Sequence, residues 1–375
     1  MNQSAQPGAR PATPGVATAE APHQQQGRAA MVSKALADAW ATASRLGLRR
    51  GSLALIRPAL MALAAPPVLC AIALLAAQGV AIHWLLASLT LVASLLALAG
   101  VSALTSARRS LTAEHDEEDK WSPLRPAAPT HADKQAPQVD AETAAQRSFA
   151  LRLGLALLAL AALCALPIVL TGTIAAALTG ALAIVVLALY GVDVVRQRSA
   201  PLDEILTPLA LGPGLVSLTI VAQGQRMNLK DWLVAVALGA MAFAVIEGRR
   251  LREVRTMEAT GAENAHVQRS LATLLGPRAA TLLIAVALLA SYSLAMGIAA
   301  LQNGWPGALL ALISLPTALI GLSGLLLSHF TPARRAAARQ LTWAYLWFGL
   351  ALTVGLALTL LAQNIINAIT LALGS

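Results

Sequence analysis

The fold is decided by the stretch TLLIAVALLASYSLAMGIAALQNGWPGALLALISLPTALIGLSGLLL at 281–327, which contains no ionisable Asp, Glu, Lys, Arg or His. A short polar loop, Gln302–Pro306, divides it into two apolar runs. About 20 apolar residues are needed to cross the hydrocarbon core of a bilayer, and each run has that length. Because lipid offers the backbone no hydrogen-bond partner, both runs must be helical. The stretch therefore predicts two membrane-spanning helices joined by a short turn.

The same pattern recurs along most of the chain. The 375 residues are 57% hydrophobic and only 12% charged, which is too apolar for a soluble domain. We predict nine apolar spans, near 58–78, 82–104, 149–169, 173–192, 205–223, 231–247, 279–301, 306–328 and 342–366. The fold class expected from this pattern is an all-α polytopic membrane protein with nine transmembrane helices.

Positive charge alternates with the gaps between these spans. Of the 27 Lys and Arg, all but Arg226 and Lys230 lie before the first span, in every second gap, or at the helix ends facing those gaps. Cytoplasmic loops carry such an excess because Lys and Arg resist translocation. We therefore predict a cytoplasmic N-terminus, a multi-pass location in a bacterial-type inner membrane, and anionic lipid as a partner. Topology also explains the net charge of +9, so no nucleic-acid partner is expected.

The segment before the spans divides into two parts. Residues 1–30, rich in Ala, Pro, Gln and Gly, are expected to form a disordered tail. Residues 31–50 place apolar side chains at helical spacing among basic ones, which predicts an interfacial amphipathic helix. A solvated helical linker is the alternative. Residues 51–375 would then form the transmembrane domain.

Acidic residues are absent from the middle of every predicted span, and Glu247, at the cytoplasmic end of the sixth, comes closest. Ion-coupled transporters usually place carboxylates near the bilayer midplane, so that class is disfavoured. Cys70 and Cys164 both lie inside spans, which excludes a disulfide framework. The polar chemistry of the chain is therefore expected at the cytoplasmic ends of the helices.

Four segments in order resemble the UbiA superfamily of intramembrane prenyltransferases, closest to its menaquinone (dihydroxynaphthoate polyprenyltransferase) branch. The segments are RPALMALAAPPVLCAIALLAAQG at 57–79, Tyr190 and Glu204 followed by LALGPGL at 209–215, QRSLATLLGPRAA at 268–280, and LTWAYLWFGLALTVGLAL at 341–358. The resemblance implies a nine-helix bundle and transfer of a polyprenyl group from a polyprenyl diphosphate to an aromatic quinone precursor. It also implies Mg²⁺, held under the diphosphate by two Asp-rich motifs after the second and sixth helices.

The chain departs from the family at the first motif. Ser106, Ala107 and Ser110 stand where Asn, Asp and Asp are expected. The resemblance leaves Asp116 and Glu114 as the remaining candidate metal ligands. It also leaves Arg125 as a candidate substrate-binding residue, because it keeps a basic position of the family.

The second motif is altered as well, in the segment EGRRLREVRTMEATGAE at 247–263. Leu251 replaces the key Asp, while Glu247, Arg250 and Glu253 fall on matching positions and become the candidate catalytic residues. Arg249 is a candidate substrate-binding residue, since guanidinium groups bind phosphate oxygens in pairs.

Two interpretations of these changes remain open. In the first, the acidic residues hold a metal ion in an altered geometry, and Arg249, Arg250 and Arg252 bind the diphosphate directly. In the second, they are ordinary loop charges on a catalytically degenerate UbiA-like protein that binds isoprenoid lipid or a partner. Tyr190 and Glu204 are likewise expected either to line the mouth of a substrate cavity or to pack at helix ends.

Overall fold

A computed structural model describes residues 61–109, 136–171, 200–260, 271–301, 305–327 and 331–374. These residues belong to one unit of the chain, Leu53–Ser375. The expected tail at 1–30 and interfacial helix at 31–50 lie outside the described residues. Both remain predictions.

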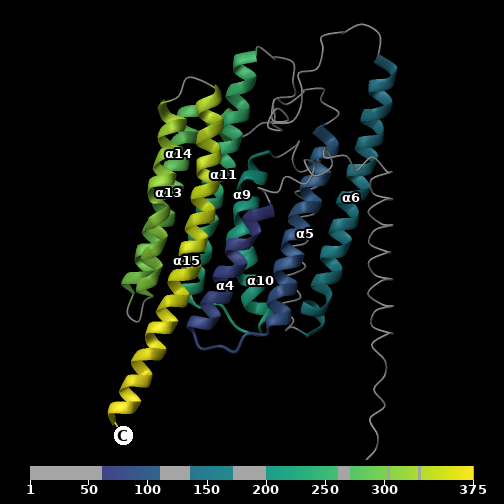
Figure 1. The fold of residues 1–375 in the computed structure, drawn as a ribbon. Coiled ribbons are helices and arrows are strands. Elements are labelled where there is room, and N and C mark those ends of the chain that lie inside the picture. The colour runs from purple at the N-terminus through teal and green to yellow at the C-terminus, as the bar shows by residue number, and fades with distance from the viewer. Residues whose placement is uncertain are drawn as a thin grey trace, which may run out of the picture. The chain divides into compact units, whose positions relative to one another are not determined.

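Every element in the described part of the chain is helical, as predicted (Figure 1). In chain order the elements are η1 (Ala62–Ala64), α4 (Ala65–Ala77), α5 (Trp84–Arg109), α6 (Ala136–Thr171), α9 (Ala200–Leu209), the π-helical turn η3 (Ala210–Gly214), α10 (Leu215–Ala222), α11 (Leu229–Thr260), α12 (Leu271–Leu275), α13 (Pro277–Ala300), the 3₁₀ helix η4 (Pro306–Ser314), α14 (Leu315–Leu327) and α15 (Thr331–Gly374).

Seven helical segments in the described ranges are long and apolar enough to cross a membrane. They make the chain a multi-pass membrane protein. The first predicted span appears as the shorter apolar helix Ala62–Ala77, and the predicted span at 173–192 lies outside the described residues. The count of nine spans and the orientation of the N-terminus therefore stay predictions.

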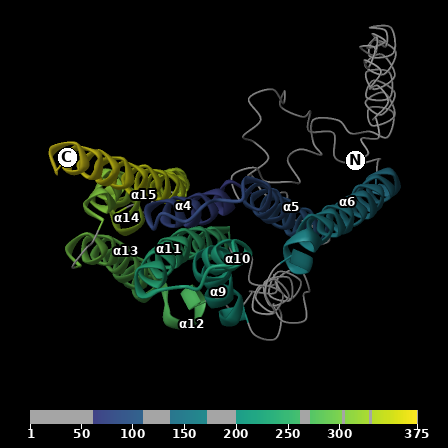
Figure 2. The same ribbon diagram turned by 90° about the horizontal axis from the view of Figure 1, so that it is seen from below.

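Helix α11 is the centre of the bundle. It packs against α13, α15, α4, α9 and η3, and the four α-helices lie around it in the view along the helices (Figure 2). Its side chains from Val234 to Val245 alternate small and large apolar groups, many of them fully buried. By contrast, α6 packs on α5 at the edge of the described helices. A helix that is apolar on all sides is expected at such a central position.

Neutral polar side chains in the bundle interior are hydrogen-bonded. The Tyr345 hydroxyl donates to the carbonyl oxygen of Leu63 at 2.8 Å. The hydroxyls of Tyr292 and Ser314 lie 2.8 Å apart, and the Tyr292 ring meets Phe348 edge to face at 5.4 Å. A buried hydroxyl without a partner costs free energy, so these pairs help to fix one arrangement of the helices.

Glycines permit two close helix crossings. A Cβ atom on Gly355 of α15 would meet the backbone carbonyl of Gly307 in η4. A Cβ atom on Gly212 in η3 would meet the backbone of Gly239 in α11. The LGPGL sequence at 211–215 therefore includes a π-helical turn packed in the protein interior, and small residues allow its backbone to approach α11.

A polar clamp closes the end of the bundle where α4 and α10 finish. Gly79 and Gly224 follow these helices with φ of 74° and 75°, a conformation that glycine adopts without strain. Beyond them, the buried Asp231 carboxylate accepts hydrogen bonds from the Gln78 side chain at 2.7 Å and the Asn228 backbone N–H at 2.9 Å. Asp231 thus caps the start of α11 and ties it to the α4–α5 turn.

We expect the substitution Asp231→Ala to lower the free energy of unfolding by about 1–2 kcal/mol, because it removes a helix cap and both hydrogen bonds accepted by a buried carboxylate. The measurement is thermal unfolding of purified protein in detergent. Gln225→Ala, which changes an exposed residue in the connection between α10 and α11, serves as the control. Equal midpoints for Asp231→Ala and the native protein would contradict a stabilising role for the clamp.

Helices also run past the predicted span ends. α6 begins at Ala136 and α11 continues to Thr260, so parts of the loops expected at 105–148 and 248–278 are helical. These extensions are rich in Ala, Glu, Arg and Gln, which favour helix in water. A hydropathy pattern marks where the bilayer ends and does not mark where the helix ends.

Candidate functional site

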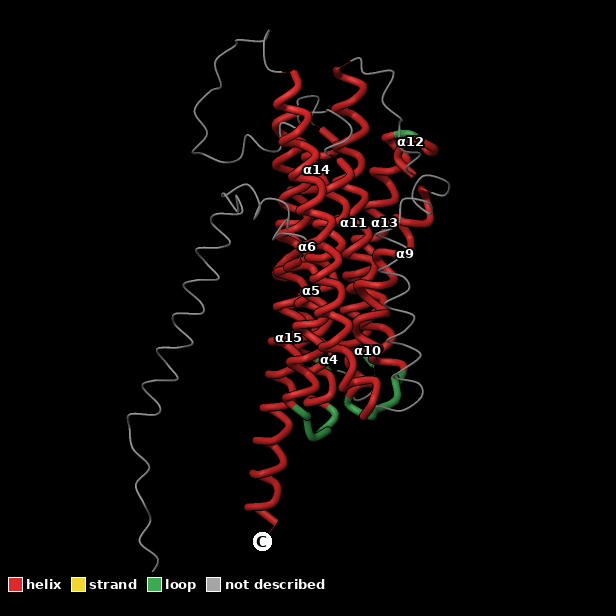
Figure 3. The backbone as a smooth tube through the Cα atoms, turned by 90° about the vertical axis from the view of Figure 1, so that its right-hand side faces the viewer, coloured by secondary structure: helices red, strands yellow, loops and turns green. Residues whose placement is uncertain are grey.

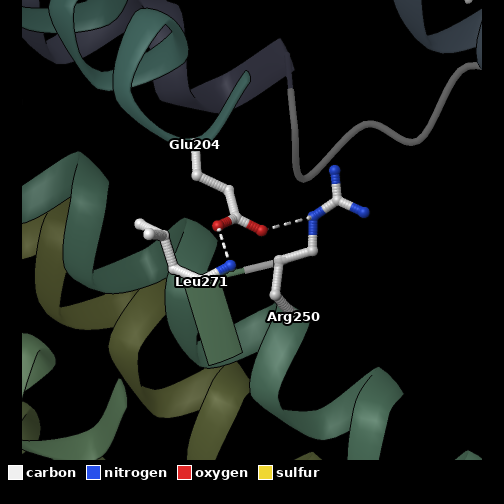
Figure 4. A network of polar contacts seen from close by, with 3 residues as sticks. All are labelled: Glu204, Arg250 and Leu271. Carbon is white, nitrogen blue, oxygen red and sulfur yellow. Dashed lines mark hydrogen bonds and ion pairs between the residues drawn. The ribbon is translucent and has the colours of Figure 1, made fainter. Parts of the chain in front are cut away.

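Glu204 joins three helices at the end of the bundle opposite the polar clamp. It lies in α9 and is 1% exposed. One carboxylate oxygen accepts the backbone N–H of Leu271, the first residue of α12, at 2.6 Å. The other lies 3.8 Å from Nε of Arg250 in α11 (Figure 4). A buried carboxylate requires such charged and hydrogen-bonding partners.

The ion pair with Glu204 orients the Arg250 side chain. Because Arg250 uses Nε toward Glu204, its two terminal nitrogens point away from that carboxylate (Figure 4). Its side chain is 13% exposed. The neighbouring Arg249 points to α15 and donates to the Thr342 hydroxyl at 3.3 Å. The guanidinium groups of two residues that are adjacent in sequence are thus held by contacts with different helices.

Glu247 lies one helical turn before Arg250 and is fully buried. Neither of its carboxyl oxygens has a hydrogen-bond partner among the described residues. The charges acting on it are Glu204, which is repulsive, and Arg250, which is attractive. While both groups are ionised they offer only acceptors to each other and repel, whereas a protonated Glu247 would donate a hydrogen bond to Glu204. For Glu247 to be ionised in this setting, it requires a positive partner in addition to Arg250.

Tight packing holds this part of α11 in place. Leu251 is 1% exposed and belongs to the apolar core. A Cβ atom on Gly248 would lie 2.7 Å from a methyl carbon of Leu341 in α15. Gly248 and Leu251 therefore fix the depth and rotation of α11, and with them the position of Glu247.

The structure brings together three of the residues selected from the sequence, Glu204, Glu247 and Arg250, while Arg249 is directed toward α15. Glu253 lies further along α11, and its side chain is outside the described part. Four more fall outside the described residues and remain predictions, namely Glu114, Asp116, Arg125 and Tyr190.

Sequence reasoning missed two partners of the site. Leu271 contributes only its backbone N–H, and an apolar side chain gives no signal of that role. Its place inside the segment 268–280, which was selected by resemblance, was the available hint. Thr342 holds Arg249, but nothing in the sequence indicated which helix would lie beside it.

Two substitutions of Glu204 should distinguish the contributions of its two contacts, with Arg250 and with the Leu271 N–H, to stability. Glu204→Ala loses both, and we expect a decrease of about 2–3 kcal/mol in the free energy of unfolding, since hydrogen bonds to charged groups are the strong ones. Glu204→Gln keeps an acceptor for the Leu271 N–H and should lose about half as much. Thermal unfolding in detergent measures both variants. Equal losses for the two would mean that the N–H contact contributes nothing.

Among the described residues, no group of three or more His, Cys, Asp or Glu could hold a metal ion. Glu247 and Glu204 are the carboxylates that this part of the chain brings close together. Only Glu247 has oxygens without a hydrogen-bond partner. The described part therefore offers a cation one available carboxylate, beside an Arg.

Fold and site together define a multi-pass helical membrane protein with a buried charged cluster at one end of its helices. No model of a known protein family matches the chain, and no curated protein matches it. Among solved structures, that of a digeranylgeranylglyceryl phosphate synthase in membranes is similar, with a TM-score of 0.47 and 14% identity. The similarity covers 80% of this chain and 95% of the other.

Proposed function

We propose that the chain is a UbiA-type intramembrane prenyltransferase. It would transfer a polyprenyl group from a polyprenyl diphosphate to an aromatic quinone precursor at the cytoplasmic face of an inner membrane. The sequence resemblance supports the reaction class. The cluster of Glu204, Glu247 and Arg250 is the proposed binding site for the diphosphate.

The observation that carries the proposal is the unpartnered, fully buried carboxylate of Glu247 beside Arg250. Burying an unpartnered carboxylate costs folding free energy, and such groups are concentrated at sites that bind a ligand or carry out a reaction. It lies at the position that the resemblance assigns to the second motif. A packing role would have favoured an apolar residue there.

Arg250 is oriented to bind the diphosphate. Arg250, held through Nε by Glu204, directs its terminal nitrogens away from that carboxylate (Figure 4), and guanidinium groups bind phosphate oxygens in a bidentate manner. Glu204 acts as a positioning residue in this scheme. The apolar helices around the site exclude water, which protects an allylic cation until the aromatic ring attacks it.

Mg²⁺ remains part of the proposal. The unpartnered oxygens of Glu247 fit a cation, and Mg²⁺ commonly takes only one or two carboxylates, completing its shell with water and substrate phosphate. Asp116 and Glu114 are the further ligands expected from the sequence. When bound, the ion would neutralise charge on the leaving diphosphate.

The direct test incubates purified protein in detergent with radiolabelled polyprenyl diphosphate, dihydroxynaphthoate and Mg²⁺. Labelled prenylated product that disappears with EDTA is the expected result. A related enzyme of known activity serves as the positive control. No product at protein concentrations where the control is active would overturn prenyl transfer to this acceptor.

One observation favours a second function, binding of an isoprenoid lipid without transfer. Leu251, at the position where the resemblance expects a metal-binding Asp, is packed in the core. Binding of labelled polyprenyl diphosphate that is saturable, independent of Mg²⁺ and without product would support this alternative.

Restoring the first motif tests whether residues 106–110 correspond to it. We expect the double substitution Ala107→Asp and Ser110→Asp to strengthen Mg²⁺-dependent diphosphate binding, because carboxylates are added where the family holds the ion. Equilibrium binding with and without EDTA measures the change. Unchanged binding would mean that residues 106–110 do not correspond to the first motif.

A further inference from the structure

Helix α15 is much longer than a bilayer requires. Its apolar segment Ala336–Leu373 has 38 residues and a mean hydropathy of 1.9. About 20 residues suffice for a span. Residues 343–360 alone extend over about 27 Å at 1.5 Å per residue, close to the thickness of the hydrocarbon core. The remaining part, residues 361–373, is called the distal segment below.

The distal segment projects beyond the other helices, at the end of the bundle where α4 and α10 finish (Figures 1 and 3). Thr359 marks the level of the bundle's edge, since its hydroxyl accepts the backbone N–H of Gly307 at the start of η4. From Leu361 onward every residue of the segment is exposed. Its large apolar side chains are 52–83% exposed; they are Leu361, Ile365, Ile366, Ile369, Leu371 and Leu373.

An outward stripe connects the spanning part of α15 to the distal segment. Within the span, exposed residues recur every three or four positions, at Trp343, Trp347, Leu350, Val354 and Leu358. The spacing continues without interruption through Leu361, Ile365 and Ile369. Because the first part of the stripe faces lipid, the distal apolar face continues an existing lipid-facing surface.

The opposite side of the distal segment is polar. Gln363, Asn367 and Thr370 follow one another at helical spacing, away from the stripe through Ile365 and Ile369. Leu371 is the exception on this side. No Asp, Glu, Lys, Arg or His occurs from Gln340 onward, so the segment is amphipathic and uncharged.

We propose that the distal segment is a membrane-surface helix whose partner is the bilayer itself. α15 would bend after Leu361, away from the bundle. That rotation turns the outward stripe toward the bilayer, so Ile365, Ile369 and Leu373 enter the boundary between headgroups and acyl chains. Gln363 and Asn367 then face water. Amphipathic helices bind membranes in this orientation.

Two features favour lipid over a second copy of the chain as the occupant. Helices that pair within membranes present small residues to each other, whereas this stripe consists of Trp, Leu, Val and Ile. Asn364 and Asn367 are weak helix formers, which lowers the cost of a bend near the bilayer edge. A straight helix would instead leave six large apolar side chains in water.

The test uses single cysteines carrying a nitroxide spin label in proteoliposomes, in a Cys70→Ser and Cys164→Ala background. Oxygen reports lipid exposure, and a water-soluble nickel chelate present on both sides reports water exposure. We expect the oxygen-to-nickel accessibility ratio to be roughly threefold or more higher at Ile365→Cys and Ile369→Cys than at Gln363→Cys and Asn367→Cys. Leu350→Cys provides the lipid-facing reference.

Two outcomes overturn the proposal. High nickel accessibility at all four positions would place the segment in water. Spin–spin broadening at Ile365→Cys that vanishes on dilution with unlabelled protein would assign the stripe to a second copy. In addition, Ile365→Lys with Ile369→Lys should expel the segment and lower the ratio at Leu373→Cys. The matched polar-face pair Gln363→Lys and Thr370→Lys should leave that ratio unchanged.

Discussion

Glu247→Leu is expected to reduce prenyl transfer by about 100-fold or more and, at the same time, to raise the free energy of unfolding by about 1 kcal/mol or more. Removing a preorganised charged group from an active site has catalytic effects of this size. The gain in stability follows because an unpartnered buried carboxylate is replaced by an apolar side chain of similar volume. Product formation and thermal unfolding are measured on the same preparation.

Glu247→Gln is the matched control, since it keeps the shape and removes the charge. It should lose activity like Glu247→Leu but gain little stability, because the amide still needs hydrogen-bond partners. A Glu247→Leu variant that retains full activity would exclude a role for this carboxylate in the reaction. A variant that is strongly destabilised would show that Glu247 has a structural partner.

Gly355→Ala should produce the largest loss of stability, about 3 kcal/mol or more. The added methyl group would meet the carbonyl of Gly307, a backbone atom that cannot rotate away, so η4 and α15 must separate. Their separation would also strain the 3.2 Å hydrogen bond between the Gly307 N–H and the Thr359 hydroxyl. Thermal unfolding in detergent gives the effect.

Gly297→Ala controls for the chemical change itself. Gly297 lies inside α13, and nothing lies within 4 Å of a Cβ atom added there. Alanine is a better helix former than glycine, so this variant should gain up to about 1 kcal/mol. If the two substitutions moved the unfolding midpoint equally, close packing at Gly355 would not be the cause of its effect.

Much of the fold could be predicted from the sequence because hydropathy responds directly to the bilayer. The apolar runs near 82–104, 231–247 and 279–301 each correspond to a helix. The ends of α6 and α11 could not be predicted in this way, since helices of Ala, Glu and Arg continue in water without an apolar signal. The end of α15 could not be predicted from hydropathy for a different reason, since amphipathic spacing replaces continuous hydrophobicity after Leu361.

The candidate site was predictable to a lesser degree. Glu204 and Arg250 were selected from the sequence as separate residues, yet their ion pair depends on how α9 packs on α11. The Leu271 backbone N–H and the Thr342 hydroxyl complete the contacts, and neither has a chemical signature in the sequence. The packing of the helices decides which neutral groups form hydrogen bonds with a charged side chain, and the sequence does not show this.

The position of Glu204 has a consequence for the chain around it. One carboxylate joins α9, α11 and α12, so an anion that competes for Arg250 would alter how firmly the first residue of α12 is anchored. Ligand occupancy and the anchoring of Leu271 would then be thermodynamically linked. Protection of the Leu271 amide from hydrogen exchange offers a way to follow that linkage.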